Sequence, residues 1–327
     1  RSKYGCRGST TEGCTGISTV IEANTLAEAP VIVGGNEAQK TKYLGRMTEE
    51  PLLCAYGVTE PNSGSDVASL KTTAVRKGDH YVLNGEKMWI TGMHVATHCA
   101  MFARTAGKAG DASGITCFLV PNPTEGLTIE EWMWTFNMPT DHAHIRLTDV
   151  RVPHASIFGG EGKGLQVVQH FFNENRIRQA ASSLGAAQYC INEAVAYANS
   201  RVTWGKKLST NQGIQFPLVE LHTEAAMLRQ LIRYTASLMD GSHKSDRPDV
   251  EGFMEFTHLV AMCNYRANRL CCDAADRAMQ TCGGVGYSRH MPFEHIYRHH
   301  RRYRITEGAE EIQMRKVAQQ LFGFGRN

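Results

Sequence analysis

The spacing of apolar residues constrains this chain most, because it changes from helical to strand-like and back to helical. Over residues 11–50 apolar residues recur near helical spacing, which predicts helices, one of them over 36–47. Short apolar runs separated by turn residues occupy about 52–153, and helical spacing returns beyond Gly164. This order predicts an α+β fold with more than one domain.

The strand-like region predicts a small β-barrel or sandwich. Its runs contain β-branched and aromatic residues and are bounded by turn residues, and Asn84-Gly85 is a strong signal for a two-residue hairpin turn. The runs lie at 81–83, 100–103, 115–120 and 144–147.

The C-terminal half predicts a bundle of helices. Long helical segments there are joined by short loops that contain Gly, Pro or Ser-Asp, which favours antiparallel packing of a four-helix type. The segments lie at about 183–200, 215–240, 250–282 and 309–322. The predicted domains are therefore a partial N-terminal helical domain over 1–51, a central β domain over 52–155 and a C-terminal helical bundle over 156–327.

Composition excludes several classes of function. The chain has 327 residues and a formal net charge of +3, which is too small to argue for nucleic acid as a partner. No apolar run approaches the ~20 residues that a membrane-spanning helix needs. The ten cysteines show no zinc or redox spacing, and several lie in apolar runs, so we expect reduced thiols and a reducing compartment.

Three segments carry residues suited to chemistry on a flat ligand. Residues 56–66 form a glycine- and hydroxyl-rich turn that can bring backbone N–H groups against a ligand. Residues 87–91, Lys-Met-Trp-Ile-Thr, contain a Trp that can cover the face of a flat ring. Residues 304–309, Arg-Ile-Thr-Glu-Gly-Ala, place a carboxylate between a short side chain and a glycine.

Together and in this order, the three segments resemble those of the acyl-CoA dehydrogenases, with most likeness to the medium-chain members. The resemblance implies N-terminal helices, a central β domain and a C-terminal four-helix bundle, and it covers nearly the whole chain. We expect the chain to be short at its N-terminus, because the family begins with more helices. The implied activity is FAD-dependent removal of hydrogen from an acyl-CoA to give a trans-2-enoyl-CoA.

The resemblance makes Glu307 the catalytic base, which removes the pro-R α-proton while the β-hydride goes to flavin N5. Such a base needs a site without competing water. Some subfamilies carry the base at the position of Asn175, but an amide cannot take the proton. Taken alone, Glu307 can also be a helix N-terminal residue favoured by the helix dipole.

The resemblance also assigns cofactor and substrate contacts. Segments of two chains contribute to one FAD site in the family, so it implies a homo-oligomer, most often a tetramer. The residues matching flavin contacts are Tyr56, Val58, Thr59, Gly64, Ser65, Trp89, Ile90, Thr91, Arg201, Thr203, Trp204, Gln212, Gln280, Gly283 and Gly284. The residues matching substrate contacts are Ser65, Asn173, Arg176, Gly308, Thr19 and Glu22, of which the last two resemble the medium-chain pattern at the bottom of the acyl pocket.

Simpler interpretations exist for two of these residues, since Trp89 can be a core residue and Arg176 a surface charge on a helix. The chain also departs from the family pattern in ways that can alter substrate fit or subunit contact without removing the base. These departures are Thr306, Ala309, Glu311 and His299.

Three other patterns favour structure over chemistry. The glycine-rich run 159–164 lacks the Lys-Ser/Thr ending of a phosphate loop. His295 and His299 lie on one helix face without the Glu of a His-Glu-x-x-His zinc motif, so we predict no metal. The basic run 298–304 is more typical of a solvated or intersubunit face than of an RNA site.

Two rival functions remain open at this stage. One is an acyl-CoA oxidase or related flavin oxidase on the same scaffold, and the other is a non-catalytic flavin- or partner-binding subunit. For a dehydrogenase, the resemblance implies electron-transferring flavoprotein as the electron acceptor. It implies the mitochondrial matrix in a eukaryote and the cytoplasm in a bacterium.

Overall fold

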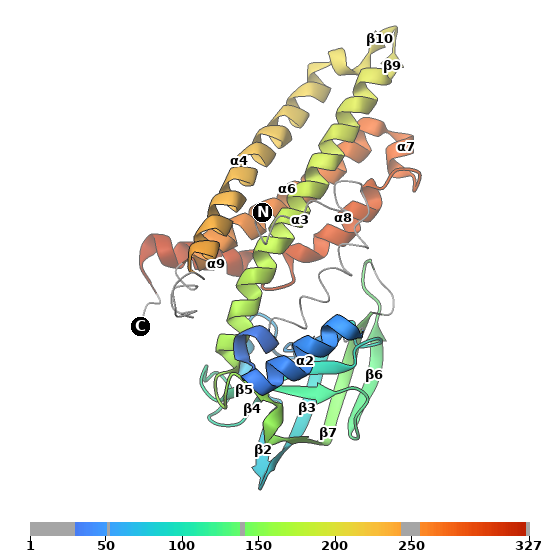
Figure 1. Ribbon diagram of the computed structural model, residues 1–327. Coiled ribbons are helices and arrows are strands. Elements are labelled where there is room, and N and C mark those ends of the chain that lie inside the picture. Colours follow the sequence, from blue (N-terminus) through green and yellow to red (C-terminus); the bar gives the residue numbers. More distant parts are fainter. Residues whose placement is uncertain (1–29, 51–52, 138–140, 243–255, 325–327) are drawn as a thin grey trace. The chain divides into compact units, whose positions relative to one another are not determined.

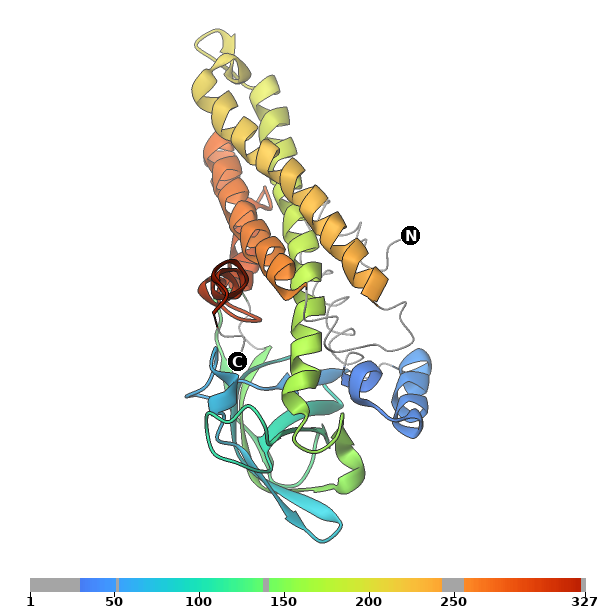
Figure 2. The same cartoon turned by 90° about the vertical axis from the view of Figure 1, so that its left-hand side faces the viewer.

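The computed structural model describes residues 30–50, 53–137, 141–242 and 256–324. These residues form two compact units, one built on strands over 30–171 and one built on helices over 172–324 (Figure 1, Figure 2). The helix α3 (Gly164–Ser200) begins in the first unit and continues into the second. The α+β class, with a β region followed by a helical bundle, is confirmed. The predicted domain limits at 51 and 155 stay predictions.

An eight-stranded sheet dominates the β unit, in the order β6-β7-β3-β2-β4-β5-β8, with β1 against β4. β1 and β2 run parallel to β4, and the other neighbours are antiparallel. Over the described residues β6 and β8 do not pair, so the sheet is open as in a sandwich. The unit comprises α2 (Glu37–Glu49), β1 (Cys54–Gly57), β2 (Thr73–Lys77), β3 (His80–Thr91), β4 (His98–Arg104), β5 (Ile115–Pro121), β6 (Leu127–Met133), β7 (His142–Pro153) and β8 (Ile157–Phe158).

The core of this unit lies against the neighbouring strands β4 and β5, which are buried along almost their whole length. β7 instead alternates buried and exposed positions, as expected for a strand with one face in the core. Tyr81, Met101 and Phe118 have no exposed surface and belong to one apolar cluster. Fully burying a side chain of this size contributes about 1.5–3 kcal/mol, so the sheet is a firm platform for the loops at its edges.

The hairpin turn predicted at Asn84-Gly85 is wrong. Both residues lie inside β3, and the chain reverses between β2 and β3 at Gly78, whose φ is +67°. Gly85, with φ +150°, marks an irregularity in the pairing with β7, and a Cβ there would collide with Thr72. A close approach of another backbone, and not a turn, therefore requires this glycine.

The helical unit comprises most of α3 with α4 (Gln212–Ser242), α6 (Thr257–Cys282), α7 (Gly284–Tyr287), α8 (Phe293–Arg301) and α9 (Glu310–Phe322). Helices α3, α4, α6 and α8 supply one apolar core and lie side by side (Figure 1, Figure 2). Many core positions are alanine, among them Ala186, Ala187, Ala274 and Ala275, all at most 1% exposed. Such small side chains let helices approach closely, so polar side chains among them are held firmly.

Two further properties concern the chain as a whole. Among the described helices, none combines the length and the apolar character that crossing a membrane requires. The eight cysteines in the described ranges are all free thiols, and burial raises the pKa of Cys54 to about 12 and of Cys282 to about 11. Thiols of this kind stay protonated and unreactive.

Candidate active site

The predicted catalytic segment forms a loop between a short turn of 3₁₀ helix, Arg302–Arg304, and α9. Within it Glu307 has φ +59° and Gly308 has φ +95°, so two successive residues are left-handed. A non-glycine residue in this region is strained unless its surroundings hold it there. The described residues contain three other such residues, Trp89, Asp149 and Trp204. Two of these three are predicted site residues.

Arg176 on α3 holds the loop through the carbonyl of Glu307. Its Nε and Nη2 donate to that oxygen at 2.9 and 2.5 Å, and Gln313 Nε2 donates to the same oxygen at 3.0 Å. Arg176 is only 2% exposed, so the interpretation as a surface charge is wrong. Burial lowers the pKa of Arg176 to about 10, and the charge of Glu307 opposes this shift. The arginine thus fixes the backbone that carries the predicted base.

Gly308 is required where it stands. A Cβ built on it would lie 3.1 Å from Gln313 Nε2 and 3.3 Å from Arg176 Nη2, the two groups that clamp the loop. Its φ of +95° is also one that only glycine adopts without cost. The glycine that follows Glu307 therefore has a steric reason. Any side chain at position 308 would push Arg176 and Gln313 away from the carbonyl of Glu307.

Ion pairs hold the two ends of the loop together. Glu310, the first residue of α9, accepts from Arg304 at 2.9 and 3.0 Å and from Arg269 on α6 at 2.9 and 3.1 Å. The two arginines lower the pKa of Glu310 to about 2. Because Arg304 precedes the loop and Glu310 follows it, their pairing fixes the distance between the loop ends. These ion pairs were not predicted from the sequence.

Buried polar side chains connect this region to the middle of the bundle. Asn268 Nδ2 donates to the carbonyl of Tyr303 at 2.9 Å, and Asn264 Nδ2 donates to the carbonyl of Arg176 at 3.0 Å. Ser183 bonds both Asn268 and His300, at 2.7 and 3.0 Å. Burying amides in an alanine-rich core is costly unless they are hydrogen-bonded, and these are. The four-residue spacing of the two asparagines on an apolar helix was the signal that could have found them.

The two predicted substrate contacts on α3 lie together behind the loop. Arg176 Nη1 donates to Asn173 Oδ1 at 3.3 Å, and Asn173 Nδ2 donates to Thr257 Oγ1 at 2.9 Å. Asn173 and Asn175 are both buried, whereas Glu174 is partly exposed. The roles of Asn173 and Arg176 toward substrate stay predictions. Thr19 and Glu22 lie outside the described residues.

In the β unit the first flavin-matching segment is held by a buried ion pair. Lys87, with no exposed surface, donates to Glu60 Oε1 at 2.9 Å and to the carbonyl of Val58 at 3.0 Å. The carboxylate of Glu60 also accepts from the backbone N–H groups of Lys71 and Thr72, at 2.6 and 2.9 Å. The turn that follows exposes Gly64 and Ser65. Fixed charges therefore hold this turn against β3.

The same strand presents Trp89 through an irregularity in the sheet. Met88 N donates to the carbonyl of Thr59 at 2.8 Å, and the register with β7 shifts between Lys87 and Ile90. Trp89 has φ +62° and is 47% exposed, whereas Ile90 is 1% exposed. A bulge that turns a side chain out of the sheet in this way is common beside functional sites. The interpretation of Trp89 as a core residue is wrong.

The remaining predicted cofactor contacts lie at one end of the bundle. β9 (Val202–Thr203) and β10 (Lys206–Lys207) form a hairpin whose two turn residues, Trp204 and Gly205, both have positive φ. Trp204 is 98% exposed, and Arg201 and Gln212 are exposed beside the hairpin in the chain. Gln280, Gly283 and Gly284 end α6 and begin α7 with exposed surface.

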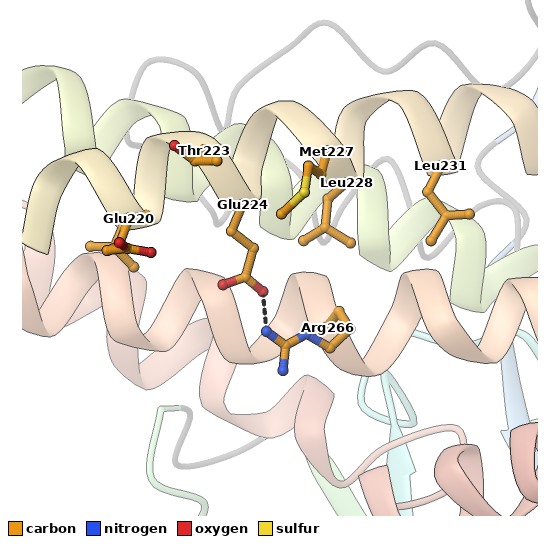
Figure 3. Close-up of a pocket in the computed structure, with 8 residues that line it drawn as sticks. Glu220, Thr223, Glu224, Met227, Leu228, Leu231 and Arg266 are labelled. Carbon is orange, nitrogen blue, oxygen red and sulfur yellow. Dashed lines mark hydrogen bonds and ion pairs between the residues drawn. The ribbon is translucent and has the colours of Figure 1, made fainter.

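A hollow of about 400 Å³ lies between α4 and α6 (Figure 3). Its apolar lining includes Met227, Leu228 and Leu231, and Glu224 pairs with Arg266 across it at 2.5 Å. None of the predicted site residues lines it.

Metal chemistry finds no support in the described part of the chain, where no three His, Cys, Asp or Glu side chains gather as ligands. His299 and His300 are fully buried, and burial lowers the pKa of His300 to about 3. Their neighbours are Tyr303, Arg302 and Ser183, which make them part of the packing next to the predicted catalytic segment.

Comparison of the sequence with known proteins finds two matching family models. The acyl-CoA dehydrogenase middle domain matches residues 55–150, and the acyl-CoA dehydrogenase C-terminal domain matches residues 162–322. An acyl-CoA dehydrogenase of Bacillus subtilis is 34% identical over 311 residues, which are 94% of this chain and 78% of the relative.

Two further relatives extend the comparison. The "Probable medium-chain specific acyl-CoA dehydrogenase 2, mitochondrial" of Caenorhabditis briggsae is 31% identical over 344 residues, with 98% of this chain and 78% of the relative covered. The structure of butyryl-CoA dehydrogenase from Megasphaera elsdenii matches with a TM-score of 0.82 at 29% identity and covers 94% of this chain and 78% of that one.

These likenesses define the class of protein as an FAD-binding oxidoreductase. The chain belongs to the acyl-CoA dehydrogenase family. Its own residues fit the cofactor, since β3 presents an exposed indole at Trp89 and the hydroxyl of Thr91 two positions on. At Gly283 and Gly284 a Cβ would meet nothing within 4 Å, which leaves their backbone open to a ligand.

Proposed function

We propose that this enzyme removes the α-proton and the β-hydride of an acyl-CoA, with Glu307 as the base, and releases a trans-2-enoyl-CoA. The proposal depends chiefly on one observation: the strained backbone of Glu307 is held by three hydrogen bonds to its carbonyl from Arg176 and Gln313. A base must be fixed to within a fraction of an ångström to act efficiently, and these bonds fix the backbone that carries the proposed base.

The proposed roles of the other residues follow from the family resemblance. The carboxylate of Glu307 takes the α-proton, the electron pair of that C–H bond forms the new double bond, and the β-hydrogen leaves with its pair. FAD supplies the hydride acceptor. Trp89 and Thr91 would hold the flavin ring, and the turn with Gly64 and Ser65 would contact it. Asn175 cannot replace Glu307, because an amide has no proton-accepting strength at neutral pH.

The acyl group, electron acceptor and assembly form the finer part of the proposal. We infer a straight medium-length acyl chain, which the match to a relative named medium-chain specific supports. Electron-transferring flavoprotein as oxidant and a homotetramer are proposed from the family resemblance. The exposed Trp204 supports the tetramer, because an aromatic side chain 98% exposed on a hairpin is suited to a neighbouring subunit.

The test compares Glu307→Gln with Glu174→Gln, a matched change near the alternative base position. Both variants should purify yellow with FAD. Mixed anaerobically with acyl-CoA thioesters of graded length, Glu307→Gln should bleach the flavin at least about 10³-fold more slowly than the wild type, whereas Glu174→Gln should be close to it. Full-rate bleaching by Glu307→Gln would remove Glu307 from its role.

Two added measurements separate the rival functions. Hydrogen peroxide released at the rate of turnover in air would identify an oxidase. Tight FAD with no response to any thioester would identify a non-catalytic subunit.

A further inference from the structure

A carboxylate, an imidazole and a hydroxyl form a series of hydrogen bonds that ends at Thr91, a predicted flavin contact. Thr91, the last residue of β3, pairs with His142, the first residue of β7. Thr91 Oγ1 lies 3.2 Å from His142 Nε2, and His142 Nδ1 lies 2.5 Å from Asp141 Oδ1. The side chains of His142 and Asp141 are only 11% and 13% exposed. The chain of bonds is thus largely shielded from water.

The donor and acceptor in each of these hydrogen bonds follow from the protonation of the groups. An ionised carboxylate only accepts, so Nδ1 of His142 carries the proton it donates to Asp141. In a neutral imidazole the other nitrogen, Nε2, is then an acceptor. With the imidazole neutral, Thr91 donates its hydroxyl proton to Nε2, which leaves the lone pairs of its oxygen for a donor on the other side. The backbone adds rigidity, because Gly92 N donates to the carbonyl of Asp141 at 2.8 Å.

A hydroxyl fixed in this way discriminates between two states of its ligand. The flavin nitrogen N5 is an acceptor when the ring is oxidised and a donor, N–H, when it is reduced. A hydroxyl that offers only lone pairs favours the second state. A freely rotating hydroxyl serves both states about equally.

We propose that the Asp141–His142 pair fixes the proton of Thr91 away from the flavin, and so raises the reduction potential of bound FAD. This inference rests on the proposed function, in which Thr91 is a flavin contact, and on the family resemblance, which implies that this Thr contacts flavin N5. His142 is a positioning residue, since it acts only through Thr91. The effect is an energetic preference for reduced FAD, which makes hydride uptake from a thioester more favourable.

The experiment measures the midpoint potential of bound FAD by anaerobic equilibration with a reference dye, at one fixed pH for all variants. His142→Leu should lower the ratio of reduced to oxidised FAD at a fixed ambient potential about tenfold. For a two-electron couple that is about 30 mV. His142→Gln should restore most of the ratio, because its carboxamide oxygen can accept from Thr91.

The matched control is His144→Leu, which removes a histidine two positions along β7 that bonds Glu86 at 3.1 Å. It should leave the potential unchanged. In a Thr91→Val background His142→Leu should also have no effect, since the hydroxyl through which it acts is gone. If His142→Leu does not fold, Asp141→Asn tests the same chain and should lower the ratio in the same direction.

Three results would overturn the inference. The first is a ratio of reduced to oxidised FAD within about twofold of the wild type in both His142→Leu and Asp141→Asn. The second is that His142→Leu lowers this ratio as much in the Thr91→Val background as in the wild type. The third is that His144→Leu lowers the ratio as much as His142→Leu does. If the wild type holds FAD and is bleached by acyl-CoA while these results appear, the inference alone has failed. A wild type that does not bind FAD overturns the proposed function and the inference together.

Discussion

Replacing Glu310 by glutamine removes the charge that Arg269 and Arg304 share, and we expect this to destabilise the helical unit by about 3 kcal/mol. The magnitude follows from the pKa of Glu310, which the two arginines lower from an ordinary 4.5 to about 2. Each pKa unit corresponds to about 1.4 kcal/mol of preference for the charged form. The carboxylate side chain is only 10% exposed, so solvent screens little of this.

The stabilisation should depend on pH in a defined direction. The pKa of Glu310 is lower in the folded protein than the unfolded value of 4.5. The charge of Glu310 therefore stabilises the folded state fully above pH 4.5, and this stabilisation is lost as the pH falls toward about 2. Glutamine resembles the protonated acid at every pH. The difference in unfolding free energy between wild type and Glu310→Gln should therefore be largest near neutral pH and shrink on acidification.

Urea unfolding followed by circular dichroism at the helical wavelengths measures this difference at each pH. The control is Glu224→Gln, which breaks another interhelical pair, the one at the hollow in Figure 3. Glu224 has a single arginine partner, Arg266, that is 42% exposed, so its loss should cost less than about 1 kcal/mol. Equal losses in the two variants, or a Glu310→Gln difference that stays constant from neutral to acid pH, would refute the reasoning.

Two further changes test the other supports of the site. Gly308→Ala should cost about 1–3 kcal/mol in thermal unfolding, because the left-handed backbone is strained and the new methyl meets the clamp, and it should slow flavin bleaching even where FAD is retained. Lys87→Met leaves Glu60 as an unpaired buried charge and should cost about 3–5 kcal/mol and weaken FAD, which an FAD titration would show. The exposed pair Arg146–Glu86 provides the control, since Arg146→Met should change the unfolding free energy by less than about 1 kcal/mol and leave FAD affinity intact.

The elements that the sequence predicted best are those whose signal is local. Helical spacing over 250–282 and 309–322 corresponds to α6 and α9, and the strand-like runs correspond to β4, β5 and β7. Asn84-Gly85 failed because its conformation is set by Thr72 across the sheet and not by the neighbouring residues. A dipeptide preference is a local property, and tertiary contacts override it.

The proposed catalytic segment was predicted through a motif, but the contacts that hold it could not be, even though Arg176 itself was a predicted site residue. Arg176 and Glu307 are 131 positions apart, and Arg269 and Glu310 are 41 apart, so no periodicity links them. Arg304 stood in a basic run that was assigned to a solvated or intersubunit face. Its ion pair with the buried Glu310 shows that one member of the run stabilises the site itself.

The two units share one local feature, a strained residue close to a buried ion pair. Trp89 and Glu307 each adopt a positive φ, and each lies within three positions of an ion pair with a buried carboxylate, Lys87–Glu60 in one case and Arg304–Glu310 in the other. A strained residue relaxes unless its neighbours are fixed more strongly than the strain, and ion pairs shielded from water provide such fixation. Loss of either pair should therefore weaken ligand binding as well as the fold, because the strained residue is then free to relax.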